Sequence, residues 1–317
     1  MKIAFFDIPK RQQPFFLEAL AGMEIVFYED KLSMDRALMV KDAEIICDFT
    51  SSLIKKDMID VLPNLKLIAT RSTGFDHIDV VYANSKGIKV CNIPAYGSET
   101  VAEFAFALLL TLSRRIREAT HALIENGNFS IPVNVQGFDL AGKTLGVVGT
   151  GKIGKNVIKI GRGFDMNVIA CDLHPDVTFA QENNFIYKSF EEVISQSDII
   201  TLHAPSTKEN FHLINKENIQ KMKKGVYLIN TARGDLIDTE ALALGLKEGI
   251  ITGAGLDVLE GEKDFKKGDI IPLLEMPNVV MTPHIAFDTK EAELRILQTT
   301  IENIKGFISG NPINIVK

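Results

Sequence analysis

The chain has 317 residues, which exceeds the size at which a single hydrophobic core usually keeps growing, so two domains are expected. Apolar residues make up 46% of the chain and charged residues 24%, a composition that is ordinary for a folded protein and argues against a disordered or fibrous one. The formal net charge of −6 gives no electrostatic support for a nucleic-acid partner.

The cysteines and the apolar segments indicate the compartment. Cys47, Cys91 and Cys171 each end an apolar run, and their odd number argues against a disulfide framework, so reduced and buried thiols are expected. The apolar stretch 101–112 is too short to cross a bilayer, and the one before Asp7 is too short for a signal peptide. We therefore expect a cytoplasmic protein without a membrane segment.

The first hundred residues alternate between apolar runs and amphipathic segments. Strands are predicted at residues 2–6, 24–28, 44–47, 66–70 and 87–91, and helices at 14–21 and 55–62. This alternation predicts a parallel sheet covered by helices. No dinucleotide-type glycine pattern occurs here, so this part of the chain is expected to have another role.

Residues 98–126 are predicted to form one long helix that is apolar over much of its surface. Ser98 and Thr100 are expected to cap its start, and Gly127 offers a place for it to end. Such a helix could be buried between two domains or against a second subunit.

A second alternating series follows this helix. Its strands are predicted at residues 144–149, 167–171, 198–202, 226–230, 251–256 and 278–282, a pattern typical of a doubly wound nucleotide-binding domain. A last helix is expected at 289–309. The predicted organisation is an interrupted one, in which residues 100–286 are inserted into a domain made of residues 1–99 and 287–317.

The segment GTGKIG matches G-x-G-x-x-G between a predicted strand and a predicted helix. That context favours a dinucleotide site, because the glycines allow a tight turn and a close approach of the pyrophosphate to the helix N-terminus. The residues expected to contact the cofactor here are Gly149, Gly151, Lys152, Ile153 and Gly154.

An acidic residue about 20 positions later is the second test of a dinucleotide site. Asp172 directly follows the next predicted strand, where its carboxylate can accept hydrogen bonds from the adenosine ribose and would repel a 2′-phosphate. No arginine follows it immediately, so NAD is favoured over NADP. The alternative is an ordinary glycine turn with a solvated aspartate.

Polar residues follow several strands of the second series. Ligands of open α/β sheets bind beyond the carboxyl ends of the strands, where these residues are expected to meet. They are His203 and Pro205 after the third strand, Thr231, Ala232 and Arg233 after the fourth, Asp257 and then Glu262 after the fifth, and His284 after the sixth.

An arginine, a carboxylate and a histidine suit hydride chemistry on a 2-oxo acid. Arg233 can grip a carboxylate with paired hydrogen bonds, and His284 can give and take a proton near neutral pH. Glu262 beside the imidazole would favour its protonated form. From these residues alone, a surface ion pair, a loop histidine and a solvated acidic loop remain open as alternatives.

Over nearly its whole length the chain resembles the D-isomer-specific 2-hydroxyacid dehydrogenases. The resemblance is carried by TRSTGFDHID (70–79), VCNIPAYGSETVAEFAFALLL (90–110), LAGKTLGVVGTGKIG (140–154), LHAP (202–205), LINTARGDLID (228–238), GLDVLEGE (255–262) and TPHIAFDT (282–289). It implies a Rossmann NAD-binding domain inserted into a flavodoxin-like substrate domain, with both sheets doubly wound and parallel, and usually a homodimer.

The resemblance also implies roles. Arg233 would bind the substrate, His284 would be the acid/base, Glu262 would pair with it, and Asp257 would approach the nicotinamide side of NAD. In the other domain the resemblance assigns the substrate carboxylate to the backbone amides of Thr73 and Gly74, and the pocket to Tyr96 and Phe49. His203, Pro205, Thr231 and Ala232 are assigned to the cofactor.

The motifs look most like the D-lactate dehydrogenase branch, with pyruvate as the oxidised substrate. Other 2-oxo acids, among them 2-oxoisocaproate, glyoxylate and hydroxypyruvate, stay open, as does a non-catalytic NAD-sensing scaffold. A metal site at His77 with Asp76 and Asp79 is not expected, because the flanking acids are too close in sequence to form a cage.

Overall fold

The computed structural model describes residues 1–132, 135–262 and 271–316, and the chain divides into two compact units. Unit 1 comprises Met1–Tyr96 and Thr289–Lys317, and unit 2 comprises Gly97–Asp288. Within the described ranges, no helix has both the length and the apolar character that crossing a membrane requires.

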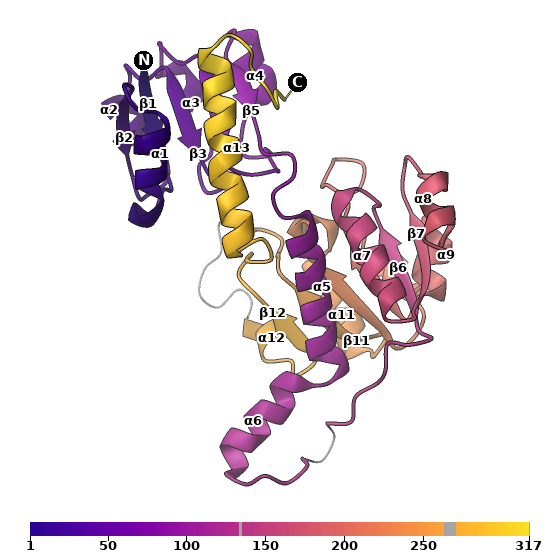
Figure 1. The fold of residues 1–317 in the computed structure, drawn as a ribbon. Coiled ribbons are helices and arrows are strands. Elements are labelled where there is room, and N and C mark those ends of the chain that lie inside the picture. The colour runs from indigo at the N-terminus through magenta and orange to yellow at the C-terminus, as the bar shows by residue number, and fades with distance from the viewer. Residues whose placement is uncertain (133–134, 263–270, 317) are drawn as a thin grey trace. The chain divides into compact units, whose positions relative to one another are not determined.

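Unit 1 is built on a five-stranded parallel sheet in the order β2-β1-β3-β4-β5 (Figure 1). The strands are β1 (Lys2–Phe5), β2 (Glu24–Phe27), β3 (Ile45–Asp48), β4 (Leu67–Thr70) and β5 (Lys89–Cys91). This order is the flavodoxin-like one, in which the chain reverses its direction across the sheet between β1 and β3. The expected sheet is confirmed, and each strand ends within a residue or two of its predicted position.

Helices cover both faces of this sheet because successive strand residues point to opposite sides. They are α1 (Gln13–Ala19), α2 (Met34–Met39), α3 (Lys56–Asp60), α4 (Val80–Ser85) and α13 (Lys290–Ile308), with a short 3-10 turn η1 (Lys10–Gln12) before α1. One buried cluster joins Phe5 to α1 and α13, and the other joins Phe6 to α2, α3 and α4. Helices α2 and α4 were not predicted from the sequence.

Unit 2 is built on a seven-stranded parallel sheet in the order β12-β11-β10-β9-β6-β7-β8. The strands are β6 (Thr144–Val148), β7 (Asn167–Cys171), β8 (Ile186–Tyr187), β9 (Ile199–Leu202), β10 (Val226–Asn230), β11 (Ile251–Leu256) and β12 (Val279–Met281). The order matches the Rossmann type, with its switch point between β6 and β9. The predicted strands are found, and the two-residue β8 was not anticipated.

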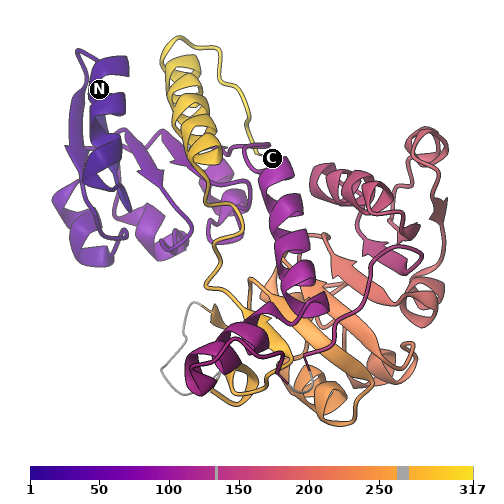
Figure 2. The ribbon, with the colours of Figure 1, turned by 60° about the horizontal axis from the view of Figure 1, so that its bottom comes forward.

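The helices of unit 2 cover both faces of its sheet, except α6, which contacts α5. They are α5 (Ser98–Ser113), α6 (Ile116–Asn126), α7 (Lys152–Gly163), α8 (Val177–Glu182), α9 (Phe190–Gln196), α10 (Lys216–Gln220), α11 (Thr239–Lys247) and α12 (Ile271–Leu274), with a 3-10 turn η2 (Gly234–Leu236). Helices α5, α7 and α8 share one buried cluster, and α9, α10 and α11 share the other. Figure 2 shows α5 lying over the strands of this sheet.

The prediction of one helix over 98–126 is wrong in two respects. The chain forms α5 and α6 with a break at Arg115, whose left-handed backbone (φ 49°) interrupts the helical hydrogen bonds. The N-cap of α5 is Gly97, which makes no side-chain capping bond, so Ser98 and Thr100 lie within the helix and not at its cap position. Gly127 ends α6 with φ 61°, as expected for a residue without a Cβ.

The cysteines are free thiols, as expected. Cys47 and Cys91 are buried in unit 1, and Cys171 is partly buried at the end of β7. Burial raises the pKa of Cys91 and of Cys171 to about 12, and it also raises the pKa of Cys47. Since the thiolate is the reactive form, these side chains act as packing groups at neutral pH.

Candidate active site

The glycines between β6 and α7 form a turn with open space for a ligand. A Cβ on Gly149 (φ 91°) would lie 2.7 Å from the amide nitrogen of Ala204, and one on Gly154 would lie 2.0 Å from the carbonyl oxygen of Gly149. A Cβ on Gly151, the N-cap of α7, would meet nothing within 4 Å. Two of the glycines are therefore required by the protein's own packing, while Gly151 leaves the helix N-terminus accessible to a pyrophosphate.

Asp172 follows β7 and faces this turn. Its Oδ2 accepts hydrogen bonds from the amide (2.6 Å) and the hydroxyl (3.0 Å) of Thr150, and Oδ1 accepts from the amide of His174 (2.8 Å). Burial favours the neutral acid, but these donors outweigh it and lower the pKa of Asp172. The carboxylate is thus fixed in place and ionised beside the glycine turn.

A series of hydrogen bonds connects Asp172 with Tyr187 on β8. The hydroxyl of Tyr187 accepts a bond from the amide of Asp176 (3.1 Å) and lies 2.8 Å from the hydroxyl of Thr150. Since the proton of Thr150 goes to Asp172, Tyr187 must donate to Thr150. Sequence reasoning missed Thr150 and Tyr187, because a variable position in a glycine motif and a two-residue strand carry no signal by themselves.

Two buried polar atoms at the carboxyl edge of this sheet have no partner among the described residues. They are the hydroxyl of Thr231, after β10, and Nδ1 of His203, after β9. Nε2 of His203 lies 2.8 Å from the hydroxyl of Thr201, and burial lowers the pKa of His203 to about 3, so the ring is neutral. Buried groups of this kind usually find a partner, and together with Gly151 and Asp172 they fit a bound dinucleotide.

The other residues assigned to the cofactor lie around the same edge. Lys152 and Ile153 begin α7, the former exposed and the latter packed against the cluster beneath α5. Pro205 follows His203 and accepts a hydrogen bond from Asn210, and Ala232 accepts one from Arg233. Their contacts with a cofactor remain predictions.

The loop after β10 is shaped by Asn230, which is fully buried. Its Oδ1 accepts from the amide of Ala232 (3.0 Å), and its Nδ2 donates to the carbonyl of Arg233 (2.8 Å). The guanidinium of Arg233 in turn donates to the carbonyl of Ala232 (2.7 Å). A Cβ on Gly234 would lie 2.1 Å from the carbonyl carbon of Leu259, so this loop packs directly against the segment that leads to Glu262.

His284 and Glu262 form a hydrogen-bonded pair. Nδ1 of the imidazole lies 2.7 Å from Oε1 of the carboxylate, and Oε2 accepts from the amide of Leu259 (3.2 Å). Burial would raise the pKa of Glu262, but the bond to His284, the amide and the nearby charge of Arg233 lower it. The three residues expected to carry the chemistry are therefore brought together at one edge of unit 2.

Asp257 holds the backbone that carries His284. Its Oδ1 accepts from the hydroxyl of Thr282 (2.6 Å) and the amide of Ile285 (2.9 Å), and Oδ2 accepts from the amide of Ala286 (2.8 Å). Its own carbonyl accepts from the amide of His284 (2.8 Å). Burial, the largest effect, raises the pKa of Asp257 despite these donors. This role in fixing the loop was not anticipated from sequence.

In unit 1 the loop 72–77 follows β4 and presents amides rather than carbonyls. Each carbonyl from residue 72 to 77 accepts a hydrogen bond, from Ile93, Asn92, Ser72, Ile78, Lys55 and Ile54 in that order. The amides of Thr73, Gly74 and Phe75 have no partner within the part of the chain that the structure describes. A run of unpaired amides is suited to an anion such as a carboxylate.

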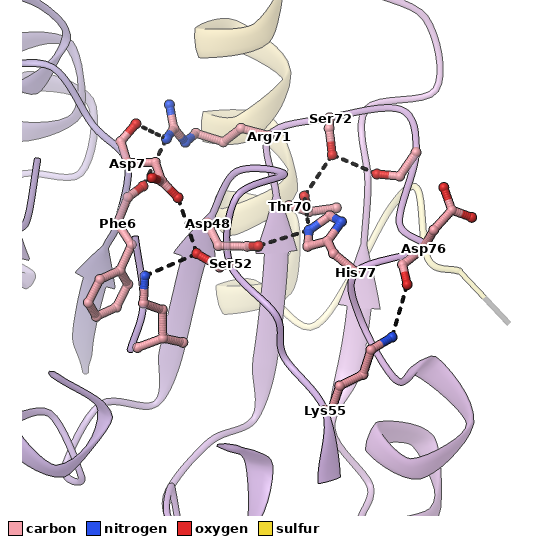
Figure 3. Close-up of polar contacts among 12 residues, drawn as sticks. Phe6, Asp7, Asp48, Ser52, Lys55, Thr70, Arg71, Ser72, Asp76 and His77 are labelled. Carbon is pink, nitrogen blue, oxygen red and sulfur yellow. Dashed lines mark hydrogen bonds and ion pairs between the residues drawn. The ribbon is translucent and has the colours of Figure 1, made fainter. Parts of the chain in front are cut away.

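Arg71 directly follows β4, before this loop, and its side chain extends to Phe6 and Asp7, which follow β1 (Figure 3). Its buried guanidinium donates to the carbonyls of Phe6 (2.9 Å) and Asp7 (2.5 Å), and its carbon lies 5.5 Å from the centre of the Phe49 ring. Phe49 is thus held at the carboxyl end of β3. Tyr96, the last residue of the first segment of unit 1, accepts a hydrogen bond from Arg295 through its carbonyl.

The residues considered for a metal have other partners. The ring of His77 bonds to Asp48, while Asp79 caps α4 by accepting the amide of Tyr82 (2.9 Å). No group of three potential metal ligands occurs among residues 1–132, 135–262 and 271–316.

Comparison with known proteins agrees with this geometry. Residues 106–286 match the family model described as "D-isomer specific 2-hydroxyacid dehydrogenase, NAD binding domain". The chain is 40% identical to a glyoxylate reductase of Thermofilum pendens (86% of this chain, 80% of the relative) and 36% identical to the D-lactate dehydrogenase of Escherichia coli (98% of each). A crystal structure of D-lactate dehydrogenase from Aquifex aeolicus, complexed with NAD and lactic acid, superposes with a TM-score of 0.92 at 39% identity over 99% of this chain and 98% of that one.

Proposed function

Since the chain belongs to the D-isomer-specific 2-hydroxyacid dehydrogenases, which are NAD-dependent enzymes, we propose that it interconverts pyruvate and D-lactate. The observation that carries the proposal is the pairing of His284 with Glu262 at 2.7 Å, on the edge that also holds Arg233. It is supported by the similarity, over nearly the whole chain, to a structure complexed with lactic acid.

The proposed acid/base is His284, through Nε2. Because Nδ1 is bonded to Glu262, Nε2 is the nitrogen left to exchange a proton with the oxygen on carbon 2 of the substrate. Bound NAD supplies the hydride acceptor for oxidation and, when reduced, the donor for reduction. The bond to Glu262 fixes the direction of the ring, and in reduction the imidazole would give its Nε2 proton to the carbonyl oxygen.

Arg233 is proposed to bind the substrate carboxylate and to polarise the carbonyl. A planar guanidinium can form paired bonds with a carboxylate, and a fixed cation stabilises the charge that develops on oxygen during reduction. For unit 1, the amides of Thr73 and Gly74 are proposed to bind a substrate carboxylate, and Phe49 and Tyr96 are proposed to contact the substrate. Unit 1 would accordingly be the substrate domain and unit 2 the NAD-binding domain.

The proposed cofactor contacts follow from the turn after β6. Gly149, Gly151 and Gly154, with Lys152 and Ile153 at the start of α7, would hold the pyrophosphate. Asp172 would accept hydrogen bonds from the adenosine ribose, while His203, Pro205, Thr231, Ala232 and Asp257 would line the path to the nicotinamide. The two unpartnered buried atoms, on His203 and Thr231, support this path.

The size of the substrate is the part of the proposal that needs a direct test. Initial rates of NADH oxidation are measured with pyruvate, 2-oxobutyrate, 2-oxoisocaproate, phenylpyruvate, glyoxylate and hydroxypyruvate, and the chirality of each product is determined. Pyruvate giving D-lactate with the highest kcat/KM is the expected result. A preference for glyoxylate would favour the second candidate function, glyoxylate reduction, which similarity to a glyoxylate reductase supports. Tight NADH binding without turnover of any acid would instead indicate an NAD-sensing scaffold.

A homodimer is proposed, with α6 as part of the contact between copies. No residue of α6 is buried within the chain, and Ile116 (50% exposed) and Ile124 (77% exposed) are apolar. Apolar side chains gathered on one projecting helix are typical of a protein interface. Light scattering coupled to size-exclusion chromatography should give twice the chain mass, and Ile124→Glu should lower it toward the monomer. A wild-type monomer would contradict this proposal.

A further inference from the structure

A row of buried polar side chains lies beneath the loop 72–77 in unit 1, and the proposed acid/base chemistry does not use it (Figure 3). Its members are Asp48 at the end of β3, Thr70 at the end of β4, and Ser72 and His77 in the loop, all at most 2% exposed. Buried polar groups cost free energy unless they are well bonded, and a buried ion pair rarely adds stability. Their presence at the carboxyl edge of the sheet calls for a function.

The hydrogen bonds in this row have one consistent direction. The hydroxyl of Ser72 donates to the carbonyl of Gly74 (2.6 Å), so the hydroxyl of Thr70, 2.8 Å away, must donate to Ser72. Thr70 can then only accept from the Nε2 proton of His77 (3.3 Å). The same proton is shared with Oδ2 of Asp48 (2.9 Å), which fixes the ring.

The carbonyl of Gly74 belongs to the same peptide plane as the amide of Phe75. In a trans peptide the C=O and N–H bonds point in opposite directions, so holding this carbonyl from the buried side turns the amide of Phe75 away from the interior. Ile93 and Asn92 hold the carbonyls of Ser72 and Thr73 in the same manner, which sets the amides of Thr73 and Gly74. Each of these three amides is therefore oriented by the hydrogen bond that the carbonyl of the preceding residue accepts.

We propose that Ser72 is a positioning residue for substrate binding. Held by Thr70 and by the His77–Asp48 pair, it orients the peptide between Gly74 and Phe75, so that the Phe75 amide becomes a further donor to the carboxylate of the 2-oxo acid. The proposal rests on the proposed function, and it adds a donor and the residues that aim it.

The test compares variants that break single links. In Ser72→Ala, KM for pyruvate and Kd for oxamate, a non-reacting analogue with the same carboxylate, should rise roughly three- to tenfold, as expected for one lost hydrogen bond. The Kd for NADH should stay unchanged, because the cofactor turn is in unit 2. Thr70→Val, which keeps the shape of the side chain, should give a smaller rise of the same kind, and Thr70→Ser should restore wild-type binding.

Two further readouts separate positioning from a general loss of stability. The double variant Ser72→Ala/Thr70→Val should bind oxamate no more weakly than Ser72→Ala, since Thr70 acts through the hydroxyl that is already absent. In the wild-type NADH complex, oxamate should shift the amide NMR signal of Phe75, and the shift should shrink in Thr70→Val and Ser72→Ala. Ser85→Ala, which removes an exposed hydroxyl bonded to the carbonyl of Tyr82, is the matched control and should change nothing.

The outcomes distinguish this proposal from the proposed function. A wild-type protein that neither binds oxamate nor reduces any 2-oxo acid would overturn both. Wild-type binding with an unchanged oxamate Kd in Ser72→Ala and Thr70→Val would overturn the positioning role alone. If Ser72→Ala does not fold, the isosteric Thr70→Val decides the matter through its oxamate Kd and its Phe75 signal.

Discussion

The imidazole of His284 and the carboxylate of Glu262 are joined by one hydrogen bond of 2.7 Å, and both side chains remain partly exposed, at 39% and 33%. His284 has a left-handed backbone (φ 55°), and its amide is bonded to the carbonyl of Asp257. A non-glycine residue in this region is uncommon and is often found where function requires a particular side-chain direction. The pair is therefore accessible to a ligand, while the backbone bond to Asp257 fixes the position of His284.

The first prediction concerns His284. In His284→Asn, which removes the acid/base but tolerates a left-handed backbone, kcat for pyruvate reduction should fall by roughly 10²–10⁴-fold. NADH affinity, measured by fluorescence titration, should stay close to that of the wild type. Ser85→Ala changes an exposed residue of α4 in unit 1 and is the control. Turnover that survives in His284→Asn would remove this residue from the mechanism.

The second prediction concerns pH. Glu262→Gln keeps the shape of the side chain but removes the negative charge that is hydrogen-bonded to His284, so the pH profile of kcat/KM for pyruvate reduction should differ from that of the wild type. The lowered pKa of Glu262 means that its stabilising contribution is present above its unfolded pKa and is lost as pH falls through its folded pKa. The Tm values of wild type and variant should therefore converge in acid. Coincident rate profiles would exclude the coupling.

The third prediction concerns Arg233. Arg233→Lys keeps the positive charge but loses the planar pair of donors, so KM for pyruvate should rise by roughly tenfold or more, and Arg233→Gln should raise it further. Arg11→Lys, at an exposed arginine in unit 1, should leave KM unchanged. A wild-type KM and kcat in Arg233→Lys would show that the guanidinium does not bind the substrate.

The fourth prediction compares glycines of α7 and its N-cap. Gly151→Ala should fold normally, because its Cβ meets no protein atom, yet it should bind NADH at least roughly tenfold more weakly since the methyl group would occupy the space near the pyrophosphate. Gly154→Ala should instead lower Tm, because its Cβ would lie 2.0 Å from a backbone oxygen. Gly163→Ala, also free of contacts, is the control. Unchanged NADH affinity in Gly151→Ala would argue against this turn as the pyrophosphate site.

The fifth prediction concerns the choice between NAD and NADP. Asp172→Ala should raise kcat/KM with NADPH relative to NADH by roughly tenfold or more, because the carboxylate no longer repels the 2′-phosphate. Thr150→Val removes one donor to Asp172 and should shift the ratio in the same direction by less. The ratio is measured by steady-state kinetics with saturating pyruvate. A strict preference for NADH in Asp172→Ala would assign the discrimination to other residues.

Much of the fold could be predicted from the periodicity of apolar residues and from the polar and glycine residues that end each element. The strands of both sheets are runs of apolar residues ended by polar or glycine residues, and GTGKIG between a strand and a helix indicated the dinucleotide turn. The short elements α2, α4 and β8 were missed because they span too few residues to show a period. The break at Arg115 was missed because no proline or glycine marks it. Its left-handed backbone is set by the tertiary structure and not by the residue type.

For the candidate site too, some features could be predicted from the sequence and others could not. The sequence by itself determined which residues follow the strands, and so it named Arg233, Glu262 and His284, since parallel strands place their carboxyl ends at one edge. Only the tertiary structure decided which nitrogen of His284 faces Glu262, and that Ser72 reaches Gly74 with Thr70 and His77 behind it. Hydrogen-bond partners are set by side-chain positions on neighbouring strands and loops, and their separation along the chain leaves no periodic trace.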